Sequence, residues 1–245
     1  MPSFILRFLN IEDIIKEEYL IKRGVAMLFN LAASPAVMLI IFVFIKDKYE
    51  KEPYLMMAPA ILFGFLSCGA VIAEDIALRR ILGNVDNILL SAFVLSSGTE
   101  EITKLAVLYF LMLKNPNLNE PFDAVLYSAY VSLGFAWAEN IIYVFSPELG
   151  GVSTALMRAV FSVPGHFLFS VFMAGFFAEY HYFKKGIKYF ALSFICPWAV
   201  HGLYNIIIMW FGDFWLFVFI PYVVLLWIIC LKKMLFLSKK SPFKN

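Results

Sequence analysis

The sequence predicts an all-α, polytopic membrane protein with about seven transmembrane helices and a polar cavity between them. Hydrophobic residues make up 62% of the 245 residues and the mean hydropathy is +0.81, whereas soluble domains are roughly 45–50% apolar. Apolar segments of about 20 residues, the length that crosses a bilayer, follow one another along nearly the whole chain. Acids and histidines interrupt several of them. We therefore expect one helical membrane domain and no separate soluble domain.

Residues 1–23 are predicted to form an amphipathic extension. They lack the features of a cleavable signal peptide, because acids interrupt early and no small-residue cleavage site follows a long apolar core. Apolar residues recur there at intervals of three and four, at Phe4, Phe8, Ile11, Ile15 and Tyr19. A helix lying in the membrane interface fits this spacing, and a plain N-terminal extension is the alternative. We expect the transmembrane domain to cover residues 24–236 and a short basic cytoplasmic tail to cover residues 237–245.

The apolar segments divide the membrane domain into seven expected spans, separated by charged or Pro/Gly-containing connections. These spans cover about residues 24–45, 54–73, 87–113, 122–145, 152–180, 189–210 and 214–235. After the second span, Glu74, Asp75, Arg79 and Arg80 are expected to form a solvated polar connector.

The distribution of Lys and Arg predicts the orientation. With seven spans, twelve lysines fall on the side of the C-terminus and of the 46–53 connection, and six basic residues fall on the other side. We expect the C-terminus to be cytoplasmic and the N-terminus to lie outside. The net charge of +2 is small and scattered, so nucleic acid is not an expected partner. The three cysteines all lie in apolar spans and are expected to be packing residues.

Three charged residues lie inside the third span: Glu100, Glu101 and Lys104. A charged side chain in a bilayer costs several kcal/mol, roughly 3 on insertion scales, so such residues pair, titrate or line a wet cavity. On a helix, Lys104 is four residues from Glu100 and three from Glu101, so one ammonium can neutralise either acid. A structural ion pair between helices is the alternative to a functional site.

Other spans carry polar groups at compatible depths: Glu139 and Asn140 in the fourth, His166 in the fifth, and His201 with Asn205 in the sixth. At 1.5 Å per residue, these groups could meet between the membrane centre and the outer leaflet. A carboxylate and a histidine in a wet pocket can activate water, and a His/Asn pair can donate to an oxyanion. These are the components of amide hydrolysis.

Each polar group also has a structural interpretation. His166 could donate to a backbone carbonyl, Glu139 and Asn140 could hold helices together, and Arg158 could snorkel or pair with Glu139.

The order of these motifs resembles the PrsW-type intramembrane proteases, a group related to the CAAX prenyl endopeptidases. The resemblance covers about residues 46–210 and is carried by four motifs. These are Glu100-Glu101-Ile102-Thr103-Lys104, the pair of segments 122–127 and 134–140, His166 with Ser170, and His201-Gly202-Leu203-Tyr204-Asn205. It implies cleavage of a peptide bond in a single-span membrane-protein substrate, such as an anti-sigma factor, on the extracytoplasmic side.

The resemblance also implies roles. Glu100 would be the general base and His166 would position the water, while Glu101 and Lys104 would tune the charge of the base. His201 and Asn205 would hold the oxyanion, and Glu139 and Asn140 would line or brace the pocket.

The catalytic type and the function class leave alternatives open. Zinc could be held by Glu100, His166 and His201, but no H-E-x-x-H sequence is present and Asn205 suits an oxyanion donor, so we favour a mechanism without a cofactor. A proton-coupled transporter or a non-catalytic membrane scaffold would be the competing functions. The oligomeric state is not predicted.

Overall fold

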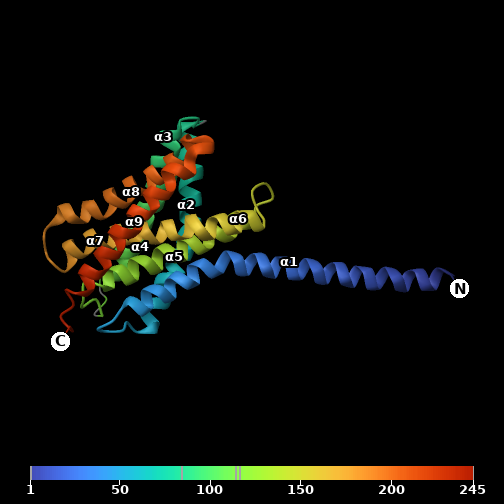
Figure 1. The fold of residues 1–245 in the computed structure, drawn as a ribbon, viewed down its shortest axis with the longest axis horizontal. Coiled ribbons are helices and arrows are strands. Elements are labelled where there is room, and N and C mark those ends of the chain that lie inside the picture. Colours follow the sequence, from blue (N-terminus) through green and yellow to red (C-terminus); the bar gives the residue numbers. More distant parts are fainter. Residues whose placement is uncertain (1, 84, 114, 116, 245) are drawn as a thin grey trace.

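The computed structural model describes residues 2–83, 85–113, 115 and 117–244, and side chains from Lys16 onward within those ranges. The described residues form helices and connections without a strand. Helix α1 (Pro2–Lys46) is unbroken and contains Pro35. Its first half extends away from the remaining helices, and its last part packs on them (Figure 1). The apolar side chains of the proposed amphipathic extension, apart from Tyr19, lie outside the described side chains.

Helix α5 (Asp123–Val144) is the centre of the bundle, and most of its side chains are buried. Helix α2 (Tyr54–Leu82) packs along it at two glycines. A Cβ atom at Gly64 would lie 2.1 Å from the Val131 carbonyl oxygen, and one at Gly134 would lie 2.2 Å from that of Ile61. Only glycine allows the two backbones to approach this closely.

Two of the helical runs contain a π-helical segment. The first run is α3 (Ile88–Leu90), η1 (Ser91–Ser96) and α4 (Ser97–Met112), in which η1 is π-helical. The second is α6 (Val152–Met157), η2 (Arg158–Ser162) and α7 (Val163–His181), in which η2 is π-helical. The chain then forms α8 (Ile187–Trp210), the short 3₁₀ turn η3 (Gly212–Phe214) and α9 (Trp215–Ser238). Short π-helical segments are rare in proteins overall, and those that occur are often located at functional sites.

The prediction of an all-helical membrane protein is confirmed, and among the described residues five helices are long and apolar enough to cross a membrane. The segments predicted as the third and fourth spans are helical, as the run 88–112 and as α5, and carry the acids, but they are not among these five candidate spans. The count of seven crossings stays a prediction. The domain division also stays a prediction; α1 continues through residues 23 and 24, and α9 continues to Ser238.

The predicted connector after the second span is wrong, because α2 continues to Leu82. Its extra turns contain an ion pair between Arg79 Nε and Asp75 Oδ2 at 2.8 Å, four residues apart on one helix face.

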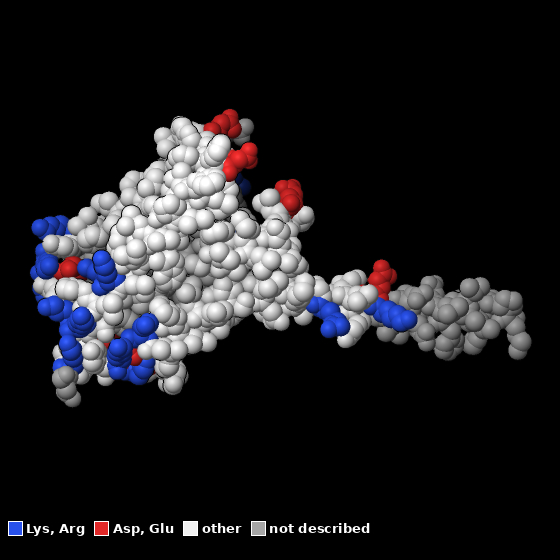
Figure 2. Space-filling view, in the orientation of Figure 1, with Lys and Arg blue, Asp and Glu red and all other residues white. Residues whose placement is uncertain are grey.

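Charge separates along the bundle of this multi-pass membrane protein. Lys and Arg side chains gather at the end where the C-terminus lies, and acidic side chains stand out at the opposite end (Figure 2). This distribution follows the sides that the sequence predicts for the connections.

Candidate active site

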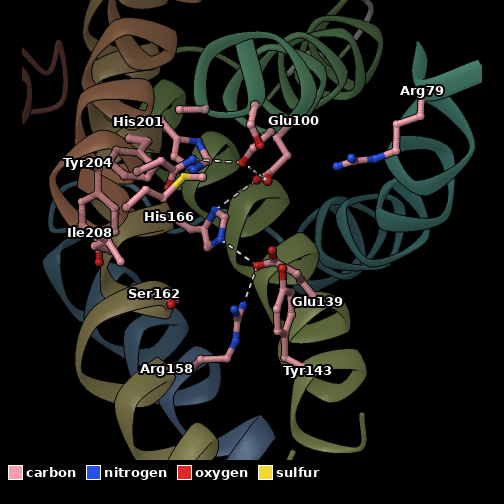
Figure 3. A pocket seen from close by; sticks show the side chains of 16 residues that line it. Arg79, Glu100, Glu139, Tyr143, Arg158, Ser162, His166, His201, Tyr204 and Ile208 are labelled. Atoms are coloured by element: carbon pink, nitrogen blue, oxygen red, sulfur yellow. Dashed lines mark hydrogen bonds and ion pairs between the residues drawn. The ribbon is translucent and has the colours of Figure 1, made fainter. Parts of the chain in front are cut away.

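Four helices bring the predicted site residues together. Helix α4 contributes Glu100, Glu101 and Lys104; α5 contributes Glu139 and Asn140; α7 contributes His166; and α8 contributes His201 and Asn205. A cavity of about 320 Å³ opens on this group and is lined by Glu100, Glu139, His166, His201 and Asn205, among others (Figure 3). A second cavity of about 330 Å³ reaches Glu100 and Glu139 from the side of α2.

Lys104 lies at the centre of the charged groups and is 1% exposed. Its ammonium is 3.1 Å from Glu100 Oε2, 2.9 Å from Glu101 Oε1 and 3.0 Å from His166 Nδ1. It also lies 4.3 Å from the centre of the Phe135 ring. One cation therefore contacts both glutamates and a histidine on another helix.

The contact with Lys104 fixes the tautomer of His166. A lysine ammonium only donates hydrogen bonds, so Nδ1 accepts and Nε2 carries the proton. Nε2 then donates to Glu139 Oε2 at 2.9 Å, and Arg158 Nη2 donates to the same oxygen at 2.6 Å. The predicted pairing of Arg158 with Glu139 is confirmed. Both ring nitrogens of His166 are thus engaged by protein groups.

Asn140 braces this side of the site from outside the cavity. Its carbonyl oxygen accepts from Arg158 Nε at 2.8 Å, and its amide donates to the Ala32 carbonyl oxygen at 2.8 Å. Helices α1 and α5 thereby hold the guanidinium against Glu139.

His201 faces the other side of the charged group. Its Nδ1 lies 3.0 Å from Glu101 Oε1, and its ring stacks on Phe169 with centroids 4.4 Å apart. Because a carboxylate only accepts, Nδ1 carries a proton. Nε2 is the nitrogen that remains for another partner.

Ser96 connects the predicted general base with the predicted oxyanion donor. Its hydroxyl donates to Glu100 Oε1 at 3.3 Å and accepts from Asn205 Nδ2 at 3.0 Å. The sequence prediction missed Ser96, although its position four residues before Glu100 on the same helical run is a signal. Tyr204, named from the sequence only within the 201–205 motif and without a role of its own, also lines the cavity with its buried ring.

Arg79 lines both cavities and points toward the charged group from α2 (Figure 3). The side chain is 52% exposed and pairs with Asp75, so the expectation that it is solvated still holds at this position.

Two π-helical segments end just before the site. Segment η1 ends at Ser96, four residues before Glu100, and η2 ends at Ser162, four residues before His166. A π-helical turn holds an extra residue, so it rotates every following side chain around the helix axis relative to a regular α-helix.

The donors needed for a metal ion lie close together. Glu100, Glu139 and His166 form one group, and Glu100, Glu101 and His201 form another, each with ligand atoms within 4.8 Å of one another. The Lys104 ammonium lies within 3.1 Å of Glu100, Glu101 and His166. The donor set therefore matches zinc in chemistry. The Lys104 ammonium contacts Glu100 and His166 of the first group and Glu100 and Glu101 of the second.

Comparison with known proteins identifies the family. The family model described as PrsW family intramembrane metalloprotease matches residues 52–231. The chain belongs to the PrsW family. The Protease PrsW of Geobacillus kaustophilus is 35% identical over 179 residues, which is 73% of this chain and 78% of the relative.

Two other relatives cover more of the chain. The Protease PrsW of Bacillus subtilis is 31% identical over 86% of this chain and 94% of its own length. That of Clostridioides difficile is 29% identical over 89% and 95%, respectively. No solved structure matches. The chain is therefore an intramembrane endopeptidase of this family. This is the function that the sequence analysis favours over a proton-coupled transporter and a non-catalytic scaffold.

Proposed function

We propose that this protein cleaves a single-span membrane protein by means of a water molecule that Glu100 activates, without a metal ion. The position of Lys104 carries the proposal. Its ammonium supplies, within 3.1 Å of both α4 glutamates and His166, the positive charge that a metal would otherwise supply.

Glu100 is the better candidate for the general base of the two adjacent glutamates. It lines both cavities, whereas Glu101 is fully buried and lines neither. A general base must come within hydrogen-bond reach of the water from which it takes the proton. Glu101 instead holds Lys104 and His201 in place.

The proposed oxyanion role of His201 requires a hydrogen on Nε2 in addition to the one on Nδ1, which faces Glu101.

The protonated ring would donate from Nε2 to the oxyanion that forms when water attacks the peptide carbonyl. Asn205 has a second amide hydrogen beyond the one that it gives to Ser96 and would donate alongside His201. Glu100 would then return its proton to the leaving amine. His166, engaged at both nitrogens, would position Glu139 and Lys104 in this arrangement and act on the water only indirectly.

If a metal ion were bound, it would polarise the carbonyl and activate water. The predicted set of Glu100, His166 and His201 is not one of the two close donor groups, so Glu100 would hold the ion either with Glu139 and His166 or with Glu101 and His201. In both groups the Lys104 ammonium already contacts two of the three residues. We therefore route no step through a metal.

The test is cleavage of a co-expressed single-span substrate together with metal analysis of the purified full chain. We expect Glu100→Gln to lower cleavage by about 10²–10⁴-fold, the usual contribution of a general base. The expected zinc content of active enzyme is well below one per chain. Glu148→Gln, at an exposed position, is the matched control. Zinc at one per chain, with activity lost on chelation and restored by zinc, would contradict the glutamic mechanism.

We propose that the substrate is a single-span protein such as an anti-sigma factor, cut at the extracytoplasmic side. The resemblance of the motifs and the gathering of basic side chains at the opposite end support this orientation (Figure 2). Comparing the membrane proteins shortened in wild-type cells with those in Glu100→Gln cells identifies the substrate. A fragment released on the cytoplasmic side would contradict the orientation.

A further inference from the structure

The second cavity beside Glu100 has no part in the proposed chemistry. It measures about 330 Å³ and lies between α2, η1 and α5. Glu100 and Ser96 line both cavities, whereas His201 and Asn205 line only the first. We call the first cavity the α8 lobe and the second the α2 lobe. The proposed general base therefore lies where the two lobes meet, and the proposed oxyanion donors lie on one side of it.

Buried apolar side chains line part of the α2 lobe. Cys68 and Val71 of α2, Leu95 of η1 and Phe135 of α5 line it, with exposed fractions of 4%, 9%, 3% and 1%. Cys68, Val71 and Phe135 also belong to one hydrophobic cluster. The centre of the Phe135 ring is 4.3 Å from the Lys104 ammonium. The apolar wall of the α2 lobe thus lies directly beside the charged group of the active site.

The charged side chains that line the α2 lobe are already paired. Arg79 Nε lies 2.8 Å from Asp75, and Glu139 and Glu100 each contact a cation, at 2.6 and 3.1 Å. A charged substrate side chain that entered this lobe would lose its hydration among apolar groups and paired charges, which is costly. An apolar side chain would instead gain free energy by leaving water. The chemistry of the walls therefore favours an apolar occupant.

The volume and the opening of the α2 lobe also suit a substrate side chain. A closed apolar cavity of about 150 Å³ binds benzene. A lobe of about 330 Å³ therefore accommodates a branched aliphatic or an aromatic side chain together with adjoining backbone. Ile72 of α2 and Ile142 of α5 also line the lobe and are exposed, so it opens at the surface of the bundle. A peptide can reach it from outside.

We propose that the α2 lobe binds the side chain of one residue that flanks the scissile bond and selects an apolar side chain from valine to phenylalanine in size. This inference rests on the proposed role of Glu100. Neighbouring side chains of an extended peptide point to opposite sides. A peptide whose scissile bond lies at Glu100 then places one flanking side chain in the α2 lobe and the other toward the α8 lobe. Val71 and Leu95, which line the α2 lobe from different helical segments, set the size of side chain that it accepts.

The test reads the cut sites that the full chain makes in cells. Labelling of new N-termini in membrane proteins, compared between wild-type and Glu100→Gln cells, identifies the bonds that are cleaved. We expect one of the two flanking positions to carry Val, Ile, Leu, Met or Phe more often than the positions around it. One protein found in this way is then prepared with Ala, Leu or Phe at that position, and kcat/KM is measured for each form.

Two variants change the size of the α2 lobe in opposite directions. Val71→Phe fills it and should lower the ratio of kcat/KM for the Leu form over the Ala form by at least about tenfold, because one methylene in an apolar pocket already changes discrimination by about 10–200-fold. Leu95→Ala enlarges it and should raise the ratio of the Phe form over the Leu form. Val224→Phe, at an exposed position of α9, is the matched control and should change neither ratio. A variant that folds poorly loses activity on all forms alike, so the ratios remain informative.

Two results would overturn the proposal while leaving the hydrolysis by Glu100 intact. One is a set of Glu100-dependent cut sites without a preference at either flanking position. The other is a pair of ratios that stays unchanged in both Val71→Phe and Leu95→Ala. If wild-type cells form no Glu100-dependent N-termini, the proposed function and this inference are both overturned.

Discussion

The buried ammonium of Lys104 should be the largest single electrostatic contribution to the stability of the bundle. Removing one partner of a buried ion pair costs about 3–5 kcal/mol, because the other charge is left uncompensated. Lys104 serves two carboxylates, at 2.9 and 3.1 Å, so Lys104→Met leaves two. We expect it to cost at least about 4 kcal/mol, a large fraction of the 5–15 kcal/mol typical of a folded protein.

A double-mutant cycle with Glu101→Gln tests the reasoning. Glu101 is fully buried, whereas Glu100 reaches the cavity, where water can solvate it. The double variant therefore removes the Glu101 charge that Lys104→Met alone leaves uncompensated. Its loss of unfolding free energy should be about 2–3 kcal/mol smaller than the sum of the losses in the two single variants. The free energies of unfolding are measured in mixed micelles by circular dichroism.

The matched control is the exposed pair Lys22–Glu18, whose side chains are 73% and 61% exposed. Its coupling should stay below about 0.5 kcal/mol. Two results would refute the central position of the ammonium. One is a double variant whose loss of unfolding free energy equals the sum of the losses for Lys104→Met and Glu101→Gln. The other is a Lys104→Met protein as stable as wild type. Zinc binding gained by Lys104→Met, but absent from wild type, would place the ammonium where a metal would lie.

Three further substitutions test the packing around the site. Ser96→Ala should lower cleavage about tenfold with little loss of stability, because it removes two hydrogen bonds at the base and the oxyanion donor; unchanged cleavage would exclude this role. Gly202→Ala places a Cβ atom 2.2 Å from the Phe93 ring in η1, and it should reduce cleavage at least tenfold by displacing that π-helical segment. Gly64→Ala should lower the free energy of unfolding by about 2 kcal/mol or more, since the new Cβ meets a backbone carbonyl. Gly69→Ala, in the same helix with open space around it, should not; equal costs for the two would contradict the close packing of α2.

The sequence predicted the helices better than their ends. Apolar runs locate each buried or lipid-facing segment, but the ion pair of Asp75 and Arg79 extends α2 beyond its apolar part to Leu82. Hydropathy alone ends a helix where charge begins, whereas i,i+4 pairs allow it to continue.

The sequence also predicted which polar residues would meet, because the fixed rise of a helix sets the depth of each side chain. Glu100, His166 and His201 do lie together. It could not predict that Lys104 also reaches His166, 62 residues away. That contact depends on the orientation of α4 and α7 about their own axes. The depth of a residue in the membrane does not determine this orientation.

The rotation comes from the two π-helical segments, and each has a local cause. In η2, the cause is Pro164, which follows the segment and has no N–H to donate to the carbonyl oxygen four residues earlier. A local change to π-helical hydrogen bonding can give such a carbonyl oxygen another donor. In η1, the hydroxyl of Ser97 bonds the Ala92 carbonyl oxygen at 2.8 Å, and Trp198 of α8 donates to the Phe93 carbonyl oxygen at 2.6 Å.

The widened turn of η1 is thus held in place by α8, the helix that carries His201 and Asn205. Both helices meet at this turn, so the position of the base depends on the docking of the helix that would hold the oxyanion. A substitution at Trp198 that removes its N–H should therefore disturb Glu100 and His201 together, although Trp198 touches neither of the cavities that they line.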